Sequence, residues 1–393
     1  MPHLHPRRST AVGRIALATL ALALISTACS GDDGSDDASG TASPDDATSA
    51  AAATDVASAS EADADGPAQP DDPVVQLVTH DSFNIGEEVL AAFTEQTGYE
   101  VQVLASGDAG VMVNQAVLTA GNPQGDVLFG IDNTLLTRAL DADVFVPHEP
   151  ADAAALDQSL VLDDQWRVTP IDRGDVCLNV DLAAYDDLGQ EPPTTLDDLV
   201  DPAYEGQLVV ENPATSSPGL AFALATYATY GADGWEAWWE DLVANDVTVS
   251  AGWEDAYYGV FSGSAGSEGD RPAVVSYASS PPAEVIFAEP AVDEAPTAVV
   301  TASCFQQVEF AGVLAGSDNE AGARALVDFM VSDTFQADIP LQMFVFPART
   351  EVELPPEFVE YAAVPDDPIT LTPAEIAEVR EDVVARWTEL VLG

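Results

Sequence analysis

The sequence predicts an α/β fold made of two lobes with a ligand cleft between them. Segments typical of strands and helices alternate from residue 73 to the end of the chain, and this alternation falls into two blocks. Polar and aromatic residues follow the ends of the predicted strands in both blocks. At about 150 residues per domain, the 393-residue chain is long enough for two such domains and a separate tail.

Residues 1–29 have the features of an export signal. Three arginines among residues 7–14 precede an apolar run over 15–25, and small residues follow at 26–28. The apolar run is too short for the roughly twenty residues that a membrane-spanning helix needs. Cys29 comes next, which predicts a lipoprotein signal with a lipid anchor on that thiol. The alternative is a plain secretory signal with an incidental cysteine, and the first two arginines also hint at twin-arginine export.

Residues 30–72 have a low-complexity composition that predicts a disordered tether. They are mainly Ser, Gly, Ala, Thr and Pro, with twelve acidic residues and no basic or aromatic residue. Such a segment cannot bury enough apolar surface to offset its ordering entropy. Together with an anchored Cys29, it would hold a folded domain at a distance from a membrane. We therefore expect an extracytoplasmic protein, in the periplasm or at the cell surface, attached to the cell membrane.

Residues 73–180 are assigned to the first lobe, with three strands and three helices in alternation. The strands are expected at 74–79, 101–105 and 126–129. The helices are expected near 87–96, 111–119 and 134–141. This βαβαβ order predicts a parallel, doubly wound sheet, and strands that are apolar throughout predict a sheet covered on both faces.

Residues 181–307 are assigned to the second lobe, where the same pattern recurs. Its strands are expected at 207–210, 247–250 and 273–277. Its helices are expected near 219–230, 234–245 and 253–262. Residues 308–393 then return to the first lobe and add the C-terminal helices. That last part is expected to hold a strand-like run at 307–315 and helices at 320–331 and 373–392. The crossings between lobes are expected near 179–182 and 307–310.

Two cysteines, Cys177 and Cys304, remain in the folded part once Cys29 is assigned to the anchor. Outside the cytoplasm two such cysteines most simply form a disulfide, with two buried free thiols as the alternative. Neither has a His or Cys neighbour at metal-ligand spacing. We therefore expect neither a metal site nor a bound cofactor.

The charge of the chain argues against several classes of partner. The 68 acidic residues outnumber 11 basic residues, all of them arginine, and the formal net charge is −57. A nucleic-acid-binding protein needs a basic surface, and so does polybasic attraction to anionic lipid. Yet 47% of the residues are hydrophobic, which is too many for a wholly disordered acidic chain. We expect a folded, acidic monomer that does not bind nucleic acid.

Five segments at predicted strand ends or helix starts carry groups suited to ligand binding. They are His80-Asp81-Ser82-Phe83, Gly107-Asp108-Ala109-Gly110, Gly130-Ile131-Asp132-Asn133, 214–219 and 277–281. Ligands of open α/β sheets bind beyond the carboxyl ends of the strands, so two facing lobes predict one cleft. Taken singly, an Asp or Ser before a helix is more often an N-cap, and a lone tryptophan such as Trp253 is more often core.

Six segments resemble, in order and spacing, those of the bacterial thiamine-binding proteins of ABC import systems. They read THDSF, FGIDNTLL, PATSSPGLAF, VTVSAGWEDAYYGVF, VSYASSPPAEVI and FMVSDTFQADIP. The resemblance covers about residues 74–390. It implies a type II periplasmic-binding-protein clamshell, not an enzyme, that captures thiamine or its phosphates and delivers them to an ABC permease and its ATPase.

The resemblance also implies a set of thiamine-contacting residues. Carried over position by position, these are Asp108, Ala109, Ser216, Ser217, Trp253, Tyr277, Ala278, Ser279 and Ser280. Thiamine's thiazolium ring is a permanent cation, and a tryptophan or tyrosine face contributes about 0.5–2 kcal/mol to binding such a ring. Its aminopyrimidine needs a few hydrogen bonds and one carboxylate, for which Asp81, Asp108 and Asp132 are candidates. We expect Asp81 or Asp132 to contact the ligand or to buttress the cleft.

Arg173 stands where the family has a tyrosine, and it would either contact a ligand phosphate or pair with a nearby aspartate.

Two other functions remain open. The adjacent Tyr257 and Tyr258 also suit a binding protein for ferric iron or another small cation. Adjacent residues on a helix point about 100° apart, however, and Tyr257 matches the thiamine family's motif as a possible ligand contact. A thiaminase I-like enzyme would need a reactive cysteine, whereas Cys177 and Cys304 fall inside predicted strands.

Overall fold

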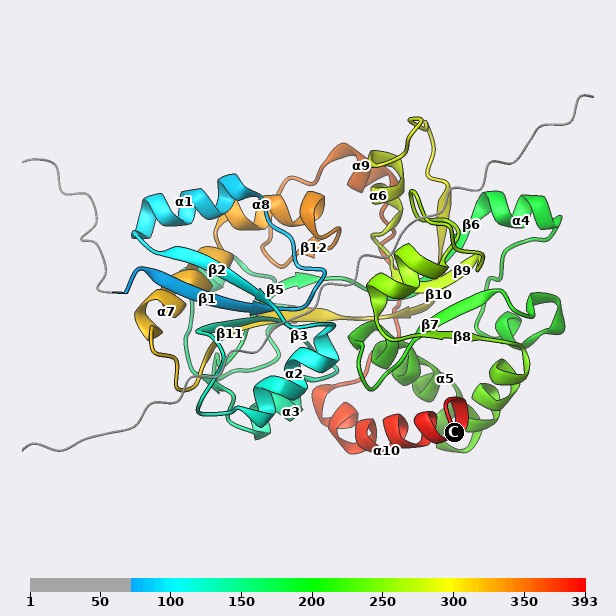
Figure 1. Ribbon diagram of the computed structural model, residues 1–393, viewed down its shortest axis with the longest axis horizontal. Coiled ribbons are helices and arrows are strands. Elements are labelled where there is room, and N and C mark those ends of the chain that lie inside the picture. Colours follow the sequence, from blue (N-terminus) through cyan, green and yellow to red (C-terminus); the bar gives the residue numbers. More distant parts are fainter. Residues whose placement is uncertain (1–71) are drawn as a thin grey trace, which may run out of the picture. The chain divides into compact units, whose positions relative to one another are not determined.

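The computed structural model describes residues 72–393, shown in colour in Figure 1. The predicted export signal, the anchor Cys29 and all but the last residue of the predicted tether lie outside the described residues. Within residues 72–393, no helix is long and apolar enough to cross a bilayer. The described part contains two sheets, each of which forms the centre of one lobe.

The first lobe is built on a seven-stranded sheet with the strand order β12-β5-β11-β3-β1-β2, in which β4 also pairs with β11. Its strands are β1 (Val74–Thr79), β2 (Glu100–Ala105), β3 (Val127–Asp132), β4 (Phe145–Val146), β5 (Thr169–Arg173), β11 (Val308–Leu314) and β12 (Phe346–Pro347). The predicted parallel pairing joins β1 to β2 and β3. The sheet is mixed, however, because β11 enters it from the second lobe and runs antiparallel to β3, β4 and β5.

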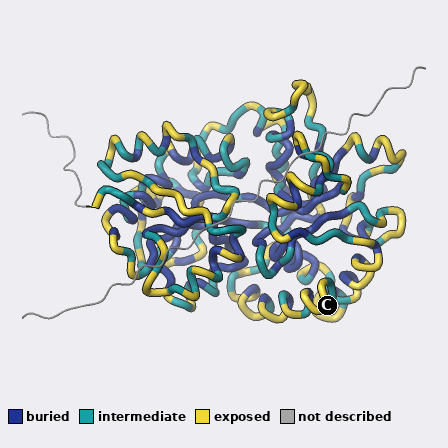
Figure 2. Tube along the Cα trace, viewed as in Figure 1, coloured by how far each residue is buried: buried dark blue, intermediate teal, exposed yellow. Residues whose placement is uncertain are grey.

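The strand β2 differs from the prediction that the strands are covered on both faces. It forms the edge of the sheet, and five of its six residues are exposed, including Val103 and Leu104. Strands β3 and β11 are buried at every position, as Figure 2 shows for the centre of the lobe. An apolar sequence therefore predicts the central strands correctly but does not reveal which strand lies at the edge.

Helices cover the first sheet on both sides. They are α1 (Glu87–Thr97), α2 (Ala109–Leu118), α3 (Leu136–Asp141), α7 (Glu320–Met330) and α8 (Asp333–Gln342). Figure 1 shows α1 and α8 on one side of the sheet, and α2 and α3 on the other. The short 3₁₀ helices η1 (Ala153–Ala155) and η2 (Gln158–Leu160) lie in the connection between β4 and β5.

The second lobe has a five-stranded sheet with the order β10-β6-β9-β7-β8. Its strands are β6 (Val176–Asp181), β7 (Leu208–Glu211), β8 (Thr248–Ser250), β9 (Ala273–Tyr277) and β10 (Thr297–Phe305). Strand β7 runs parallel to β8 and β9, whereas β6 runs antiparallel to β9 and β10. This sheet is therefore also mixed. The sequence predicts the ranges of β7, β8 and β9, whereas it places only Cys177 of β6 and Cys304 of β10 inside strands, without bounds for either strand.

The long helix α5 (Ser217–Ala244) packs against the second sheet and is interrupted at Gly231. Gly231 has φ 68° and ψ 170°, a conformation that glycine adopts without steric cost. The predicted pair of helices over 219–230 and 234–245 is therefore present, joined across this residue. The other helices of the lobe are α4 (Leu182–Leu188), η3 (Asp197–Val200), η4 (Pro202–Tyr204), the π-helix η5 (Asp255–Val260) and α6 (Pro281–Ile286).

The chain crosses between the lobes at Gly174–Asp175 and again at Gln306–Gln307, the links from β5 to β6 and from β10 to β11. The first crossing lies several residues before the expected 179–182, because β6 pairs with the second sheet. Residues 176–180 thus belong to the second lobe and not to the first. The second crossing lies beside the expected position.

The C-terminal segment also differs from a simple return to the first lobe. Helix α9 (Pro356–Tyr361) packs on α6, and α10 (Pro373–Val391) packs on α5 and on α3. Trp387 of α10 meets Trp239 of α5 edge-on, with ring centroids 5.5 Å apart. A capping box is present at the start of α10, where Thr372 and Glu375 bond each other's backbone N–H groups. This last helix therefore contacts both lobes.

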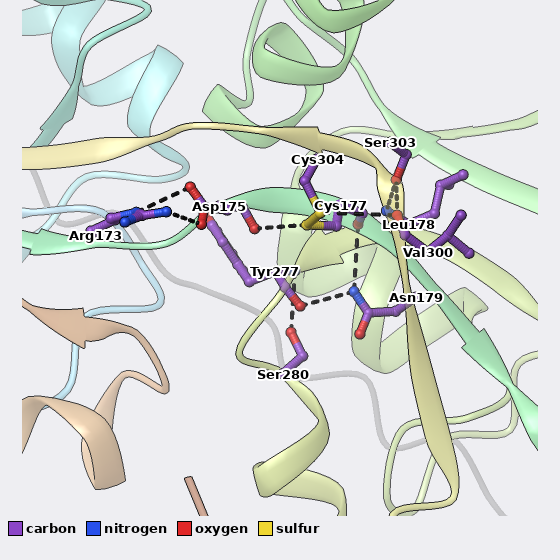
Figure 3. The surroundings of a disulfide bond; sticks show 10 residues. All are labelled: Arg173, Asp175, Cys177, Leu178, Asn179, Tyr277, Ser280, Val300, Ser303 and Cys304. Carbon is purple, nitrogen blue, oxygen red and sulfur yellow. Dashed lines mark hydrogen bonds and ion pairs between the residues drawn. A yellow bond between two sulfur atoms is a disulfide. The ribbon is translucent and has the colours of Figure 1, made fainter. Parts of the chain in front are cut away.

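A disulfide between Cys177 and Cys304 joins β6 to β10 (Figure 3). Both cysteines are buried, and Asn179 nearby donates a hydrogen bond to the carbonyl of Tyr277. The bond closes a loop with a sequence separation of 127 residues that contains most of the second lobe. It therefore joins the two strands that adjoin the crossings, β6 after the first and β10 before the second.

Candidate functional site

A cavity of about 600 Å³ lies between the two lobes. The first lobe contributes 80–84, Asp108, Ala109, Glu309 and 341–345 to its wall. The second lobe contributes Ser217, Pro218, Trp253, Glu254, Tyr257, Tyr258, Tyr277, Ser280, Ala283 and Phe287. Such a volume is typical of sites that enclose a small organic molecule.

The wall formed by the second lobe is aromatic. Trp253, which lies just before η5, and Tyr257 within η5 stack with ring centroids 4.9 Å apart and an angle of 19° between the rings. Tyr258 meets Trp253 edge-on at 5.4 Å, and Tyr277 lies 6.0 Å from it. The indole N–H of Trp253 donates to Ser276 Oγ at 2.9 Å, which fixes the orientation of the ring. The cavity therefore presents a preorganised aromatic surface.

Tyr257 is held by a buried carboxylate behind this wall. Its hydroxyl donates to Glu284 Oε1 at 2.8 Å, and Glu284 Oε2 accepts the backbone N–H of Ala265. Burial, reinforced by the charge of Glu284, raises the pKa of Tyr257 well above its ordinary value. Tyr257 therefore stays a neutral phenol that supports the aromatic wall.

Asp108 links the two lobes across one side of the cavity. It precedes α2 in the first lobe, and its carboxylate accepts the backbone N–H of Trp253 at 3.0 Å and that of Ser217 at 3.3 Å. Two residues on, Gly110 packs so closely on Thr215 of the second lobe that an added Cβ would lie 2.5 Å from the Thr215 carbonyl oxygen. The lobes thus touch backbone to backbone at this point.

Two aromatic rings form a second contact between the lobes at the cavity wall. Phe287, which follows α6 in the second lobe, meets Phe344 of the first lobe edge-on, with centroids 5.7 Å apart. Two separate contacts between the lobes are therefore made by residues that line the cavity. The structure represents a closed clamshell.

The charges around the cavity are mostly negative. Asp81, Asp108, Glu254 and Glu309 line it, and His80 is the one basic side chain among the lining residues. Burial raises the pKa of Asp108, which the N–H of Trp253 partly offsets, and burial also raises the pKa of Glu254. This combination of aromatic faces and carboxylates suits a cationic, flat ligand.

Asp132 lies behind the cavity wall at the second crossing. It is fully buried, its Oδ1 accepts the Thr134 hydroxyl at 2.6 Å, and its Oδ2 accepts the Gln307 amide at 2.5 Å. The same Gln307 amide lies 3.2 Å from Ser217 Oγ of the second lobe. Burial raises the pKa of Asp132 to about 6, although these hydrogen bonds oppose the rise. Asp132 thus buttresses the crossing and does not face the cavity.

Most of the predicted site residues come together in the cavity wall. The lining includes Asp81, Asp108, Ala109, Ser217, Trp253, Tyr257, Tyr277 and Ser280. The remaining candidates are buried beside the wall without lining it: Ser216, Ala278, Ser279 and Asp132. Of the two alternatives for Arg173, the structure shows the ion pair, with Asp175 at 2.7 Å (Figure 3).

Several lining residues were not among the predicted ligand contacts. Glu309 lies in β11, where it is the one charged residue in an otherwise apolar, buried strand, and that isolated charge is a signal the sequence does contain. Phe287 and Phe344 carry no comparable signal, because their place at the cavity depends on how the lobes close.

Comparisons with known proteins agree with this geometry. The family model described as bacterial extracellular solute-binding protein matches residues 122–366, more than half of the chain. The chain belongs to this family. Extracellular solute-binding proteins function outside the cytoplasm, and the two-lobe α/β fold is that of the type II periplasmic binding proteins.

Individual relatives of this solute-binding protein cover most of its length. The thiamine-binding periplasmic proteins of Salmonella typhimurium and Escherichia coli are each 29% identical over 326 residues, which is 81% of this chain and 94% of theirs. A solved periplasmic thiamin binding protein superposes with a TM-score of 0.71 at 29% identity, covering 83% of this chain and 99% of its own. Iron-bound HitA from Pseudomonas aeruginosa, at 20% identity and TM-score 0.63, shares the fold; the match covers 81% of this chain and 99% of HitA.

Proposed function

We propose that this protein is the substrate-binding component of an ABC importer and that it captures thiamine in the cavity between its lobes. The observation that carries the proposal is the juxtaposition of the Trp253–Tyr257 stack with carboxylates that have no arginine partner in the cavity wall. The names of the relatives described above support the same ligand. The thiazolium ring would lie against Trp253, whose indole face attracts a cation by about 0.5–2 kcal/mol.

Unphosphorylated thiamine suits this cavity better than its phosphates. All eight arginines between residues 73 and 393 form ion pairs with carboxylates, and none lines the cavity. A phosphate would face Asp81, Asp108, Glu254 and Glu309 with only His80 as a cationic partner. Like charges at this range oppose binding. Thiamine is therefore the preferred ligand, ahead of thiamine diphosphate.

The protein would capture thiamine by closing its two lobes around the ligand. In the closed state Asp108 accepts two N–H groups from the second lobe, and Phe287 meets Phe344. Ligand bound between the lobes adds contacts that exist only in this state, so it shifts the population from open to closed. The closed monomer then presents both lobes to the permease, whose ATPase powers import.

The protein would work while tethered to the cell membrane. Cys29 is the proposed lipid anchor after removal of the signal, and residues 30–72 are the proposed acidic linker. Metabolic labelling with a fatty acid, compared between the wild type and Cys29→Ser, tests the anchor directly. Loss of the label in the variant is expected, and equal labelling of both proteins contradicts the anchor.

Ferric iron is a less suitable ligand for this cavity. Iron would need phenolate ligands, but the hydroxyl of Tyr257 is committed to Glu284 and its pKa is raised. Among residues 72–393, no group of three or more His, Cys, Asp or Glu side chains is arranged to hold a metal ion. Burial also raises the pKa of Tyr258 and Tyr277, the other two phenols that line the cavity, which disfavours their ionisation as iron ligands.

A thiamine-cleaving enzyme is likewise not favoured. A cysteine nucleophile must be a thiolate, and Cys177 and Cys304 are joined in a disulfide away from the cavity lining. A binding role without catalysis is therefore proposed.

Isothermal titration of the purified chain tests the proposal. We expect 1:1 binding of thiamine, at least tenfold weaker binding of thiamine diphosphate, and no colour or heat change specific to ferric citrate. Thiamine recovered unchanged after overnight incubation would agree with a pure binding role. Absence of thiamine binding, or a tyrosinate–iron absorption band on ferric addition, would contradict the proposal.

A further inference from the structure

Three carboxylates lie side by side in one row across the first sheet. In the β-ladder Glu309 of β11 pairs with Asp132 of β3 on one side and with Asp172 of β5 on the other. Asp132 and Asp172 are fully buried, whereas Glu309 reaches the cavity wall. Glu309, the middle member of the row, is therefore the carboxylate that lines the cavity.

Asp172 lies behind the cavity wall, where its surroundings disfavour a charged carboxylate. Burial and the adjacent charge of Glu309 raise the pKa of Asp172 well above its ordinary value. Two neighbouring carboxylates rarely ionise together, because each charge opposes the other. Burial therefore favours the neutral form of Asp172, neither oxygen of which has a hydrogen-bond partner among the described residues, and Glu309 is the member of the pair that lines the cavity.

His80 lies beside Glu309 with its ring position fixed. The ring occupies the space over Gly130, where a Cβ would overlap it, and Gly130 has a φ of 97° that favours glycine. Phe129 packs against the same ring with centroids 5.7 Å apart. His80 Nε2 lies 3.7 Å from Glu309 Oε1, too far for a hydrogen bond, and it has no other partner among the described residues.

The other carboxylates at the cavity are engaged or peripheral. Both oxygens of Asp108 accept N–H groups of the second lobe. Asp81 and Glu254 are exposed residues. Glu309 is the buried lining carboxylate that has a fixed donor, His80, next to it. A ligand that carries a hydrogen-bond donor next to a hydrogen-bond acceptor would match this pair, because Glu309 accepts hydrogen bonds and His80 can donate one.

We propose that Glu309 and His80 together bind the amino-substituted edge of the ligand's pyrimidine ring, with Glu309 accepting from the exocyclic amine and His80 Nε2 donating to the adjacent ring nitrogen. This inference rests on the proposed thiamine function and specifies which residues recognise the second ring. The thiazolium ring is then left to Trp253, so each lobe supplies the main contact to one ring of the ligand.

The test compares thiamine with oxythiamine, in which a carbonyl replaces the amine and the adjacent ring nitrogen carries hydrogen. Oxythiamine thus reverses donor and acceptor at this edge while it keeps the thiazolium ring. Calorimetric titration of the wild-type protein should show at least tenfold weaker binding of oxythiamine. In Glu309→Gln, thiamine should bind at least tenfold more weakly than in the wild type, and the preference for thiamine over oxythiamine should shrink to threefold or less.

Glu254→Gln serves as the matched control, since it removes the same charge from the cavity by the same substitution, outside the pair. It should lower the affinities for thiamine and oxythiamine by equal factors. If Glu309→Gln lost affinity for thiamine and for oxythiamine by the same factor, the inference would be overturned. Equal affinity of the wild-type protein for the two compounds would also overturn it, and that comparison requires no variant. A wild type that binds neither compound would instead overturn the proposed function itself.

Discussion

At the scale of single residues, Trp253 shows how the cavity is preorganised before any ligand arrives. Its indole N–H is bonded to Ser276, its ring stacks on Tyr257, and its backbone N–H is bonded to Asp108. A ring fixed in this way loses little rotamer freedom on binding, so more of the cation–π attraction is retained as affinity.

Two substitutions of Trp253 distinguish the contribution of its aromatic face to thiamine affinity from the contribution of its apolar volume. We expect Trp253→Leu to weaken thiamine binding about tenfold and Trp253→Phe to weaken it about threefold or less, because phenylalanine keeps an aromatic face. Calorimetric titration of both variants measures the difference. Equal losses in the two variants would show that the ring's π face does not contribute.

Asp132 is the second residue whose environment makes a measurable prediction. Its pKa of about 6 in the folded protein exceeds the ordinary 3.8, so the folded state binds the proton more tightly than the unfolded chain. The Asp132 contribution to stability is therefore fully present below about pH 4 and is lost as the pH rises through 6.

Asp132→Asn should remove this pH dependence without breaking the network, because Gln307 Oε1 has no partner and can accept from the new amide. Relative to the wild type, the free energy of unfolding of the variant should rise by up to about 3 kcal/mol between pH 4 and pH 7.5. Urea denaturation at several pH values measures it. A difference that stays constant with pH would contradict the buried-carboxylate account.

At the scale of elements, closure depends on the approach of two helix starts. Helix α2 of the first lobe and α5 of the second meet where Gly110 touches the backbone of Thr215. Only a residue without a Cβ allows this approach, since the contact is with rigid backbone and not with a flexible side chain.

Gly110→Ala should therefore hinder closure without harming the fold. We expect thiamine affinity to fall at least tenfold, while the melting temperature of the ligand-free protein stays equal or rises, because alanine suits a helix better than glycine. Gly234→Ala in α5 is the matched control, where an added Cβ meets only Tyr230 Cβ at 3.5 Å. Equal thiamine affinity in the two variants would exclude this contact as a requirement for closure.

The elements that the sequence predicts correctly are those with strong local signals. Strands β1, β3 and β9 are apolar runs beside clear helices, and α10 begins with a capping box. The antiparallel strands β5, β6 and β10 around the crossings have mixed composition, and their pairing joins residues far apart in the chain. Local patterns carry no information about such pairing, which is why the first crossing was misplaced.

The same distinction applies to the site. Asp108, Trp253 and Tyr277 stand at element ends with recognisable motifs, and all three line the cavity. Glu309 and Phe344 reach the cavity only through the sheet register and the closing of the lobes. Their roles follow from tertiary structure and not from the neighbouring sequence.

At the scale of the whole molecule, the dominant feature is uncompensated negative charge. Residues 73–393 hold 56 acidic residues and eight arginines, a net charge near −48. Each arginine already has an acidic partner, so most carboxylates repel one another across the surface. This repulsion favours solubility but opposes the compact state.

Salt should therefore stabilise the folded protein. Raising sodium chloride from 10 mM to 500 mM shortens the screening length from about 30 Å to under 8 Å, which weakens repulsion between surface carboxylates. We expect the melting temperature to rise by several degrees over this range, measured by calorimetry without ligand. A melting temperature that is unchanged or lower at 500 mM would mean that the surface charge does not limit stability.

The most direct test of the central claim is a crystal structure of the protein with thiamine. We predict one thiamine in the cavity between the lobes, with its thiazolium ring centroid within about 6 Å of the Trp253 ring and its amino edge toward Glu309 and His80. Thiamine bound elsewhere on the molecule, or an empty cavity in crystals grown at saturating thiamine, would contradict the account.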